Sequence, residues 1–311
     1  MFAPQYAGIY ITHRCNLDCT YCNVHKKNSK ELSVDKWINI CEILNNIGIK
    51  KLTILGGEPT VRNDLPVLVN YIIQNTNMDL NIVSNGTASF DVIDELLKVK
   101  LKQFSSSVDT LDNSSIDIHS LIKSQKAMKT FEYIKSKSNI KLTAYMVLTK
   151  QNANRIQDMV KKLSAKGIYL YILPYHYSLN NGEWITRDLI RNDNLALDSM
   201  PSEKLNDVVY TLINMKKNGY LISNSIEYLC SLPEYINNFT WHCKSDIHEL
   251  RIDSDGSLMC CHDNRGTETP SFSVFDLQEK SAISKIIKAR ANDSGKCLGC
   301  YWPSQYHSNM F

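Results

Sequence analysis

The 311-residue sequence has no apolar run long enough to cross a membrane, and residues 1–14 lack the apolar core of a signal peptide. It also lacks a strong charge imbalance, because 35 basic and 32 acidic side chains give a formal net charge of +3. These absences argue against a membrane protein and against a nucleic-acid-binding surface. Ten cysteines without an export signal favour thiols that bind metal in a reducing cytoplasm over disulfides.

Three of these cysteines lie close together near the N-terminus. Cys15, Cys19 and Cys22 follow the spacing C-x3-C-x2-C. Three thiolates can ligate three irons of a four-iron cluster and leave the fourth iron open for a substrate or cosubstrate. No fourth ligand is evident in the sequence close by. His13 and His25 flank the triplet, however, so a zinc site is the alternative.

A second motif follows a short buried strand predicted at the segment Leu52-Thr53-Ile54-Leu55. Gly56 and Gly57 allow backbone groups to approach a ligand closely, and Glu58 adds an acceptor for an ammonium group. Each motif alone is a weak signal, but in this order the two resemble the radical S-adenosylmethionine superfamily. The resemblance implies a cluster on the cysteine loop and a GGE-type segment that holds the methionyl ammonium of S-adenosylmethionine.

Short apolar runs alternate with helical patterns from residue 8 to about residue 176. Strict alternation predicts an α/β fold of parallel strands with right-handed crossovers, and the resemblance implies a partial (β/α)6 TIM-like barrel. The predicted helices lie near residues 33–47, 64–76, 91–100, 120–137 and 153–166. The six predicted strands are Gly8–Thr12, Lys51–Leu55, Asp79–Ser84, Gln103–Val108, Lys141–Thr149 and Tyr169–Pro174.

Polar residues follow several of these strands, at the carboxyl ends where ligands of parallel α/β folds lie. The resemblance implies that Ser84 and Asn85 touch the methionyl or ribose portion of S-adenosylmethionine. It also implies that Ser107 and Asp109 contact its ribose or carboxylate. Each of these residues could instead serve as a helix cap.

The chain departs from the family pattern after the fourth strand. Relatives with a C-terminal cluster domain often have an arginine there that pairs with the carboxylate of S-adenosylmethionine. Residues 117–126 offer only Lys123 and Lys126. A lysine supplies the charge but not the bidentate fork of an arginine. Lys123 is our candidate, and the sequence does not decide between the two.

Five more cysteines lie near the C-terminus. They flank a β-hairpin predicted at residues 250–259, with Asp255-Gly256 at its turn, and a helical stretch around residues 281–291. Adjacent strand residues point to opposite faces, so Cys260 and Cys261 cannot both ligate one site in a regular strand. The five are Cys243, Cys260, Cys261, Cys297 and Cys300.

The spacing of these cysteines resembles the twitch domain, a short relative of the SPASM domain, which holds one auxiliary 4Fe–4S cluster in some radical S-adenosylmethionine enzymes. The resemblance selects Cys261 from the adjacent pair. Four thiolates would close this cluster, which would then carry electrons and not bind substrate. A structural zinc ribbon is the alternative. The implied ligands are Cys243, Cys261, Cys297 and Cys300.

Three thiols, those of Cys41, Cys230 and Cys260, are not among the implied ligands. Cys41 lies on the apolar stripe of a predicted helix, which indicates a core residue. Cys230 reads either as a buried apolar residue, which we favour, or as a catalytic thiol that returns a hydrogen atom to a substrate radical. Cys260 has the same two interpretations.

The predicted organisation has three parts: a radical S-adenosylmethionine barrel at residues 1–185, a bridging helical region at residues 186–240 and an auxiliary-cluster domain at residues 241–311. The segment 175–240 should supply much of the substrate pocket, although aromatic and histidine residues more often serve packing than catalysis. Its most suggestive residues are Tyr175, His176, Tyr177, Glu183 and Trp184.

The resemblance implies that a reduced cluster cleaves S-adenosyl-L-methionine to methionine and a 5'-deoxyadenosyl radical, which abstracts a hydrogen atom from the substrate. The implied cofactors are S-adenosyl-L-methionine and two 4Fe–4S clusters, one of them auxiliary. The expected partners are a small-molecule or peptide substrate and an external one-electron reductant such as flavodoxin or ferredoxin.

Three functions are compatible with these motifs. The first is oxidation or rearrangement of a small natural product or metabolite. The second is modification of a ribosomally made peptide by thioether formation, carbon–carbon crosslinking or epimerisation. The third is a non-catalytic zinc- or iron-binding protein, against which the GGE-type segment argues. Many peptide-modifying relatives carry an N-terminal leader-binding domain, which is not expected here because the cysteine loop begins at Cys15, so a small molecule is favoured.

Overall fold

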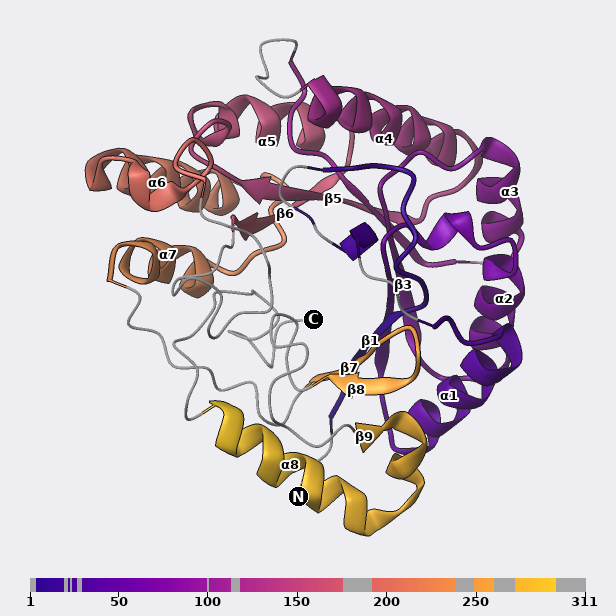
Figure 1. Cartoon of the computed structure of the whole chain (residues 1–311). Coiled ribbons are helices and arrows are strands. Elements are labelled where there is room, and N and C mark those ends of the chain that lie inside the picture. Colours follow the sequence, from indigo (N-terminus) through magenta and orange to yellow (C-terminus); the bar gives the residue numbers. More distant parts are fainter. Residues whose placement is uncertain are drawn as a thin grey trace.

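The structure is a computed structural model of the whole chain (Figure 1). It describes residues 4–19, 22, 24–26, 30–99, 101–112, 118–175, 192–238, 249–259 and 272–294. Within these residues nine strands form one sheet in the order β6-β5-β4-β3-β2-β1-β7-β8-β9. No described helix is both long and apolar enough to cross a membrane.

The first six strands are parallel to one another, which confirms the predicted partial barrel. Three of them match the predicted bounds residue for residue, and two others end one residue early. The first strand begins and ends two residues earlier than predicted. These strands are β1 (Tyr6–Tyr10), β2 (Lys51–Leu55), β3 (Asp79–Ser84), β4 (Gln103–Ser107), β5 (Lys141–Leu148) and β6 (Tyr169–Pro174).

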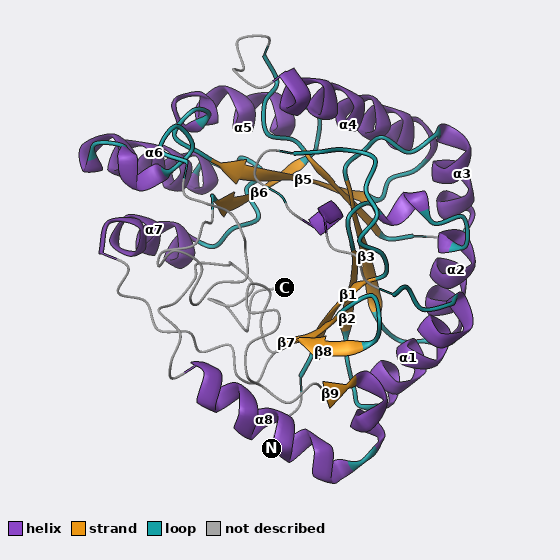
Figure 2. Cartoon of the chain, in the orientation of Figure 1, coloured by secondary structure: helices purple, strands orange, loops and turns teal. Residues whose placement is uncertain are grey.

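Five helices lie along the outer side of these strands, as Figure 2 shows. The outward-facing residue of each strand packs against them, because alternate strand residues point to opposite faces. Ile9, Ile54 and Ile82 are fully buried in one core with Trp37 and Leu68 of the helices. The helices are α1 (Val34–Asn46), α2 (Leu65–Asn75), α3 (Phe90–Lys98), α4 (Ile118–Lys137) and α5 (Ile156–Ala165), and the short η1 (Val24–Lys26), η2 (Pro59–Val61) and η3 (Ala153–Arg155) lie in the connections.

The opposite face of the strands is polar in several places. Ser105 donates a hydrogen bond to Asn81 Oδ1 over 2.9 Å, and Asn81 Nδ2 lies 3.5 Å from the hydroxyl of Tyr145. The rings of Tyr145 and Tyr171 are in contact, with centroids 4.8 Å apart. Burial raises the pKa of both tyrosines, so they are neutral donors at physiological pH. This inner face can therefore hydrogen-bond a polar molecule.

The bridging region contains two helices, α6 (Ser202–Lys217) and α7 (Ile226–Asn238), after the short η4 (Leu197–Ser199). The two helices pack against each other. The connection between them is held by β6, because Asn224 exchanges hydrogen bonds with the backbone of Ile172 at 2.7 and 2.9 Å.

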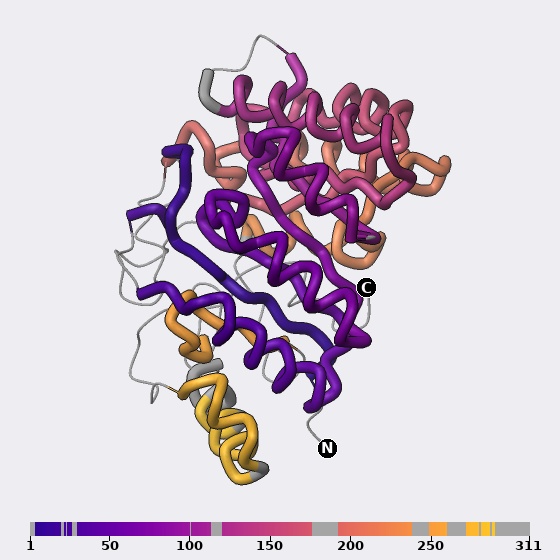
Figure 3. The backbone as a smooth tube through the Cα atoms, turned by 90° about the vertical axis from the view of Figure 1, so that its right-hand side faces the viewer, coloured from indigo at the N-terminus to yellow at the C-terminus, as the bar shows by residue number. Residues whose placement is uncertain are grey.

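The predicted C-terminal hairpin is present as β7 (Glu249–Ile252) and β8 (Ser257–Met259), followed by β9 (Phe272–Ser273), η5 (Val274–Gln278) and α8 (Lys280–Ser294). The sequence did not predict that β7 pairs in parallel with β1. The element η5 contacts α1, and Figure 3 shows α8 at the same end of the molecule. The sheet therefore continues across the predicted boundary at residues 240 and 241, and the division into three domains stays a prediction.

Candidate functional site

The three N-terminal cysteines lie on the loop that follows β1, which we call the cluster loop (Thr12–Glu31). Cys15, Cys19 and Cys22 are each partly exposed, and Cys22 N donates a hydrogen bond to Cys19 O over 3.0 Å. Burial raises the pKa of the Cys19 thiol to about 11 and also raises that of Cys15. Iron would hold these groups as thiolates in spite of that burial, because a coordinated thiol is deprotonated.

The beginning of the cluster loop runs beside the turn after β2. Gly57 N donates to Thr12 O, and Glu58 N donates to Arg14 O, each over 2.8 Å. A Cβ atom on Gly57 would lie 2.3 Å from Arg14 O, and one on Gly56 would lie 2.6 Å from Thr12 O. Both glycines therefore serve the close approach that the sequence suggested, although the neighbour they approach here is the cluster loop itself.

Glu58 is completely buried, and its carboxylate is surrounded by donors from the protein. Oε1 accepts hydrogen bonds from the backbone and hydroxyl of Thr60 and from Ser84, while Oε2 accepts from Asn85 N. Burial raises the pKa of Glu58, and these donors act in the opposite direction. The carboxylate thus ties the end of β2 to the end of β3, a positioning role that the sequence did not predict. Its contact with an ammonium group stays a prediction.

Asn85 connects the end of β3 to the cluster loop. Its Nδ2 atom lies 3.9 Å from Cys15 Sγ and donates to Asn16 Oδ1 over 2.8 Å. Asn16 in turn donates to Thr87 over 2.8 Å. An amide donor beside a sulfur ligand favours its thiolate form. Ser107, the other serine predicted here, ends β4 and is partly exposed.

Asp109 and Lys123 form a buried ion pair, with exposed fractions of only 5% and 2%. Asp109 also accepts a hydrogen bond from Val147 N over 3.0 Å. Burial lowers the pKa of Lys123, but the charges of Asp109 and Cys19 raise it by more. The pKa therefore lies above its usual value, and the ammonium stays charged. Lys126 is exposed on the same helix. Of the two lysines that the sequence offered, only Lys123 is buried in the site.

The residues around the cysteines fit an anionic iron–sulfur cluster. Among the described residues, no three His, Cys, Asp or Glu side chains are grouped as ligands of one metal ion. Lys123 supplies a positive charge toward Cys19 and Cys22, and the Asn85 amide faces Cys15.

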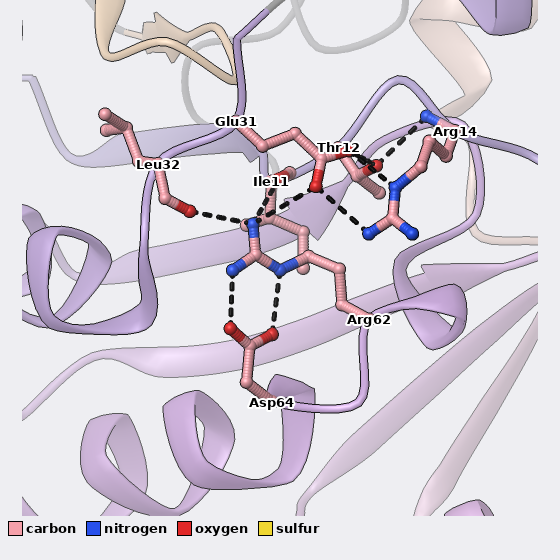
Figure 4. A network of polar contacts seen from close by, with 7 residues as sticks. All are labelled: Ile11, Thr12, Arg14, Glu31, Leu32, Arg62 and Asp64. Carbon is pink, nitrogen blue, oxygen red and sulfur yellow. Dashed lines mark hydrogen bonds and ion pairs between the residues drawn. The ribbon is translucent and has the colours of Figure 1, made fainter.

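A network of charged residues lies at the base of the cluster loop (Figure 4) and was not predicted from the sequence. Arg62 is buried and donates through Nη1 to two backbone carbonyl groups, Ile11 O and Leu32 O, each over 3.0 Å. Its Nε and Nη2 atoms donate to the two oxygens of Asp64 over 2.8 and 2.6 Å. Glu31 joins the network. The only sequence signal was the spacing of Arg62 and Asp64 directly before a helix.

The cluster loop also contacts the C-terminal hairpin. His13 is buried, and its Nε2 atom forms a hydrogen bond with the carboxylate of Asp253, which follows β7. Leu32 N donates to Ser254 O over 3.0 Å. The hairpin therefore supports the loop that carries the first three cysteines.

Several predicted residues lie outside the described part of the chain, namely Cys243, Cys260, Cys261, Cys297 and Cys300, together with His176, Tyr177, Glu183 and Trp184. Tyr175 is described and is buried beside Ala196. Cys41 is fully buried in the core, as predicted, and burial raises its pKa to about 12. The favoured burial of Cys230 is wrong, because this thiol is exposed on α7.

Known proteins resemble this chain in sequence and in fold. The model of the radical SAM superfamily matches residues 9–163. The probable GTP 3',8-cyclase of Methanothermobacter marburgensis is 34% identical over 105 residues, which are 33% of this chain and 34% of that protein. The probable GTP 3',8-cyclase of Methanococcus vannielii is 25% identical over 270 residues, which cover 81% and 82% of the two chains.

The chain thus spans about a third of the length of the first of these curated relatives. Among solved structures, Streptococcus suis SuiB bound to S-adenosylmethionine aligns with a TM-score of 0.68 at 17% identity. The alignment covers 89% of this chain and 64% of SuiB, and a likeness at that identity shows the fold alone.

Proposed function

This chain belongs to the radical S-adenosylmethionine superfamily and is an enzyme, and from that premise we propose that it removes a hydrogen atom from an unactivated C–H bond of a small polar substrate. When bound, a reduced 4Fe–4S cluster and S-adenosylmethionine supply the 5'-deoxyadenosyl radical that such a bond requires. The residues of the chain bind and orient these groups and exclude competing hydrogen donors.

The observation that carries this proposal is the meeting of four strand ends around the cluster loop. Cys15, Cys19 and Cys22 would ligate three irons and leave the fourth for the amino and carboxylate groups of S-adenosylmethionine. Hydrogen bonds link the loop to the turn after β2, and Asn85 links it to β3. Lys123 adds the one buried cation described beside the cysteines.

We assign the recognition of S-adenosylmethionine to these same strand ends. The backbone of Gly56, Gly57 and Glu58 would receive the methionyl ammonium, because the Glu58 side chain is already occupied by protein donors. Lys123 would attract the carboxylate, with its position fixed by Asp109. The predicted contacts of Ser84, Asn85 and Ser107 with the methionyl or ribose portion belong to this proposal.

An auxiliary cluster held by Cys243, Cys261, Cys297 and Cys300 is the second part of the proposal. The pairing of β7 with β1 supports it, because β8, which pairs with β7 in the same sheet, ends at Met259, and Cys260 and Cys261 follow directly in the sequence. Such a cluster would accept the electron left on the substrate radical. A thiol such as Cys230 or Cys260 would instead return a hydrogen atom, and the exposure of Cys230 on α7 favours the cluster.

The substrate is proposed to be a small molecule, with a ribosomally made peptide as the second candidate. The polar inner face of Asn81, Ser105, Tyr145 and Tyr171 supports a small hydroxylated or heterocyclic molecule. The names of the curated relatives point in the same direction, since GTP is the substrate in those names. The peptide is the second candidate because the fold resembles that of SuiB, and one SuiB structure has a precursor peptide bound. We place the enzyme in the cytoplasm, with flavodoxin or ferredoxin as reductant.

The test uses full-length protein reconstituted with iron and sulfide without oxygen. After reduction it should convert S-adenosylmethionine to 5'-deoxyadenosine and methionine, and the triple variant Cys15→Ala/Cys19→Ala/Cys22→Ala should not. Absence of 5'-deoxyadenosine from iron-replete wild-type protein would contradict the proposal. Deuterium transfer into 5'-deoxyadenosine from labelled GTP, sugars or peptides would then identify the substrate class.

A separate variant tests the auxiliary cluster. Cys297→Ala/Cys300→Ala should lower the iron content to roughly half while cleavage of S-adenosylmethionine remains measurable. An unchanged iron content would remove the auxiliary cluster from the proposal without affecting the first cluster.

A further inference from the structure

We infer that Arg62 is the positioning residue that closes the cluster loop at its base and holds it ready for the cluster before any iron binds. Arg62 lies outside the cysteine motif and outside the glycine turn. The inference rests on the proposed role of the cluster loop, but it concerns the order of the loop in the metal-free protein.

The guanidinium of Arg62 contacts the backbone on both sides of the cluster loop. A single nitrogen, Nη1, donates to Ile11 O before the loop and to Leu32 O after it, each over 3.0 Å. One donor group therefore joins the point at which the chain leaves β1 to the point just before it enters α1. Both carbonyls would otherwise be buried acceptors without this partner, and Arg62 itself is only 7% exposed. A buried group whose partner is removed is costly.

The contacts of Arg62 require an arginine at this position. A guanidinium carries five N–H donors in a rigid plane, whereas an ammonium carries three donors around a point. Arg62 uses Nη1 for the two carbonyls and the pair Nε and Nη2 for a bidentate contact with Asp64. Asp64 immediately precedes α2, so the loop is tied to a packed helix. A lysine could keep the charge but could not make both sets of contacts.

The contacts of Arg62 extend toward the cysteines through charged neighbours. Glu31 Oε2 lies 3.7 Å from Arg62 Nη1, and the same carboxylate receives two hydrogen bonds from Arg14, at 2.9 and 3.0 Å. Glu31 also accepts a hydrogen bond from Thr12. Arg14 directly precedes Cys15. Arg62 therefore acts on the first cysteine through Glu31 and Arg14.

The contacts on the far side of the loop fit the same role. Leu32 accepts from Arg62 through its carbonyl and donates to Ser254 through its N–H. The end of the loop before α1 is thereby fixed between Arg62 and the C-terminal hairpin. Removal of the guanidinium should loosen this point while the helices and the remaining strands stay folded.

The experiment measures amide hydrogen exchange in the metal-free, full-length protein, together with iron content after reconstitution. In Arg62→Met and Arg62→Lys the amides of Glu58 and Leu32, which bond at the two ends of the loop, should exchange about ten- to a hundredfold faster. Amides of the β4–β5 ladder should be unchanged. The matched control is Arg155→Lys, since Arg155 forms an exposed ion pair with Asp112 and should leave the loop amides unchanged.

Reconstituted Arg62→Lys should retain less iron than the wild type, and its reduced cluster should give a broadened electron paramagnetic resonance signal. Wild-type exchange and a wild-type signal in Arg62→Lys would overturn the inference, because charge alone would then suffice. If Arg62→Met does not fold, Glu31→Gln provides the second variant and should loosen the Glu58 amide more than the Leu32 amide. Failure of the wild type to form 5'-deoxyadenosine would count against the proposed function only, since the exchange is measured without metal.

Discussion

Two buried cations at the carboxyl ends of the strands do different work. Arg62 donates hydrogen bonds to two backbone carbonyls and, in a bidentate contact, to the carboxylate of Asp64. It makes no described contact with a cysteine. Lys123 pairs with the carboxylate of Asp109, and its ammonium lies close enough to Cys19 and Cys22 for their thiolate forms to raise its pKa. The planar, many-donor group organises backbone, and the compact point charge faces the metal ligands and the proposed cosubstrate.

The loss of Lys123 and the loss of Arg62 should destabilise the protein to different extents. A buried ion pair gains little over apolar packing, but removal of one partner leaves the other charge buried and unpaired. If Lys123 is lost, the buried Asp109 carboxylate keeps the hydrogen bond from Val147 N but loses the ammonium group that balances its charge. The partners of Arg62 are two neutral backbone carbonyls and two partly exposed carboxylates, so its removal leaves no fully buried charge without a counter-charge. The lysine site should therefore be the more sensitive of the two.

The largest expected effect is that of Lys123→Met. It should lower the free energy of unfolding by about 3–5 kcal/mol, because the buried Asp109 carboxylate loses the ammonium group that balances its charge. Urea denaturation of the metal-free protein measures this change. The double variant Lys123→Met/Asp109→Asn should recover much of the stability while binding of S-adenosylmethionine to the reconstituted protein stays weak. Recovered binding in the double variant would contradict the role of Lys123.

Gly57→Ala should come next, with a loss of about 1–3 kcal/mol, because the new Cβ would press on Arg14 O and His13 O. The matched control is Gly48→Ala, at a positive φ of 94° with open space around the Cβ position. That change should cost about 1–2 kcal/mol through backbone strain. Only Gly57→Ala should also reduce the iron content, measured after reconstitution. Equal iron content in the two variants would mean that the close approach does not serve the cluster loop.

A smaller effect is expected from acid. Hydrogen bonds from Arg62 lower the pKa of Asp64 below its usual range. A carboxyl with a lowered folded-state pKa contributes stability that is fully present above the unfolded value of about 3.9 and is lost as the pH falls through the folded value. Asp64→Asn should therefore weaken the pH dependence of unfolding below about pH 4 and leave the slope at pH 6–8 unchanged. An unaltered acid slope would show that the pair with Arg62 does not stabilise the fold.

The smallest effect is expected at the exposed pair of Arg155 and Asp112. Arg155→Ala should change the free energy of unfolding by less than about 0.5 kcal/mol, because water screens exposed ion pairs. Thermal unfolding of the two proteins side by side measures the difference. A loss as large as that at Lys123 would mean that burial does not govern the ranking.

The sequence was sufficient for the barrel because its signals are local. The strands Lys51–Leu55, Asp79–Ser84 and Tyr169–Pro174 were predicted to the residue, since each is a short apolar run between helical patterns. The prediction that Cys15, Gly57 and Asn85 meet also follows from topology, because parallel strands end at one edge of the sheet.

The remaining features depend on contacts between distant residues. Nothing local to Arg62 announces its bonds to Ile11 and Leu32, and the burial of Lys123 against Asp109 depends on how α4 packs on β4. The prediction for Cys230 was wrong because an apolar neighbourhood in sequence, Leu229 and Tyr228, does not fix which side of a helix faces water. Tyr228 and Leu229 are fully buried, whereas Cys230 of the same helix is exposed to solvent.

The parallel pairing of β1 with β7 has a consequence for how the protein is made. Residues at opposite ends of the chain, such as Ile9 and Ile252, become neighbours only when the C-terminal hairpin has left the ribosome. Until then one side of β1 is an unprotected edge, and contacts of such long sequence separation form late. Iron delivered to the nascent chain would meet a loop without its contacts to Asp253 and Ser254, so the first cluster should mature only after these two residues have left the ribosome.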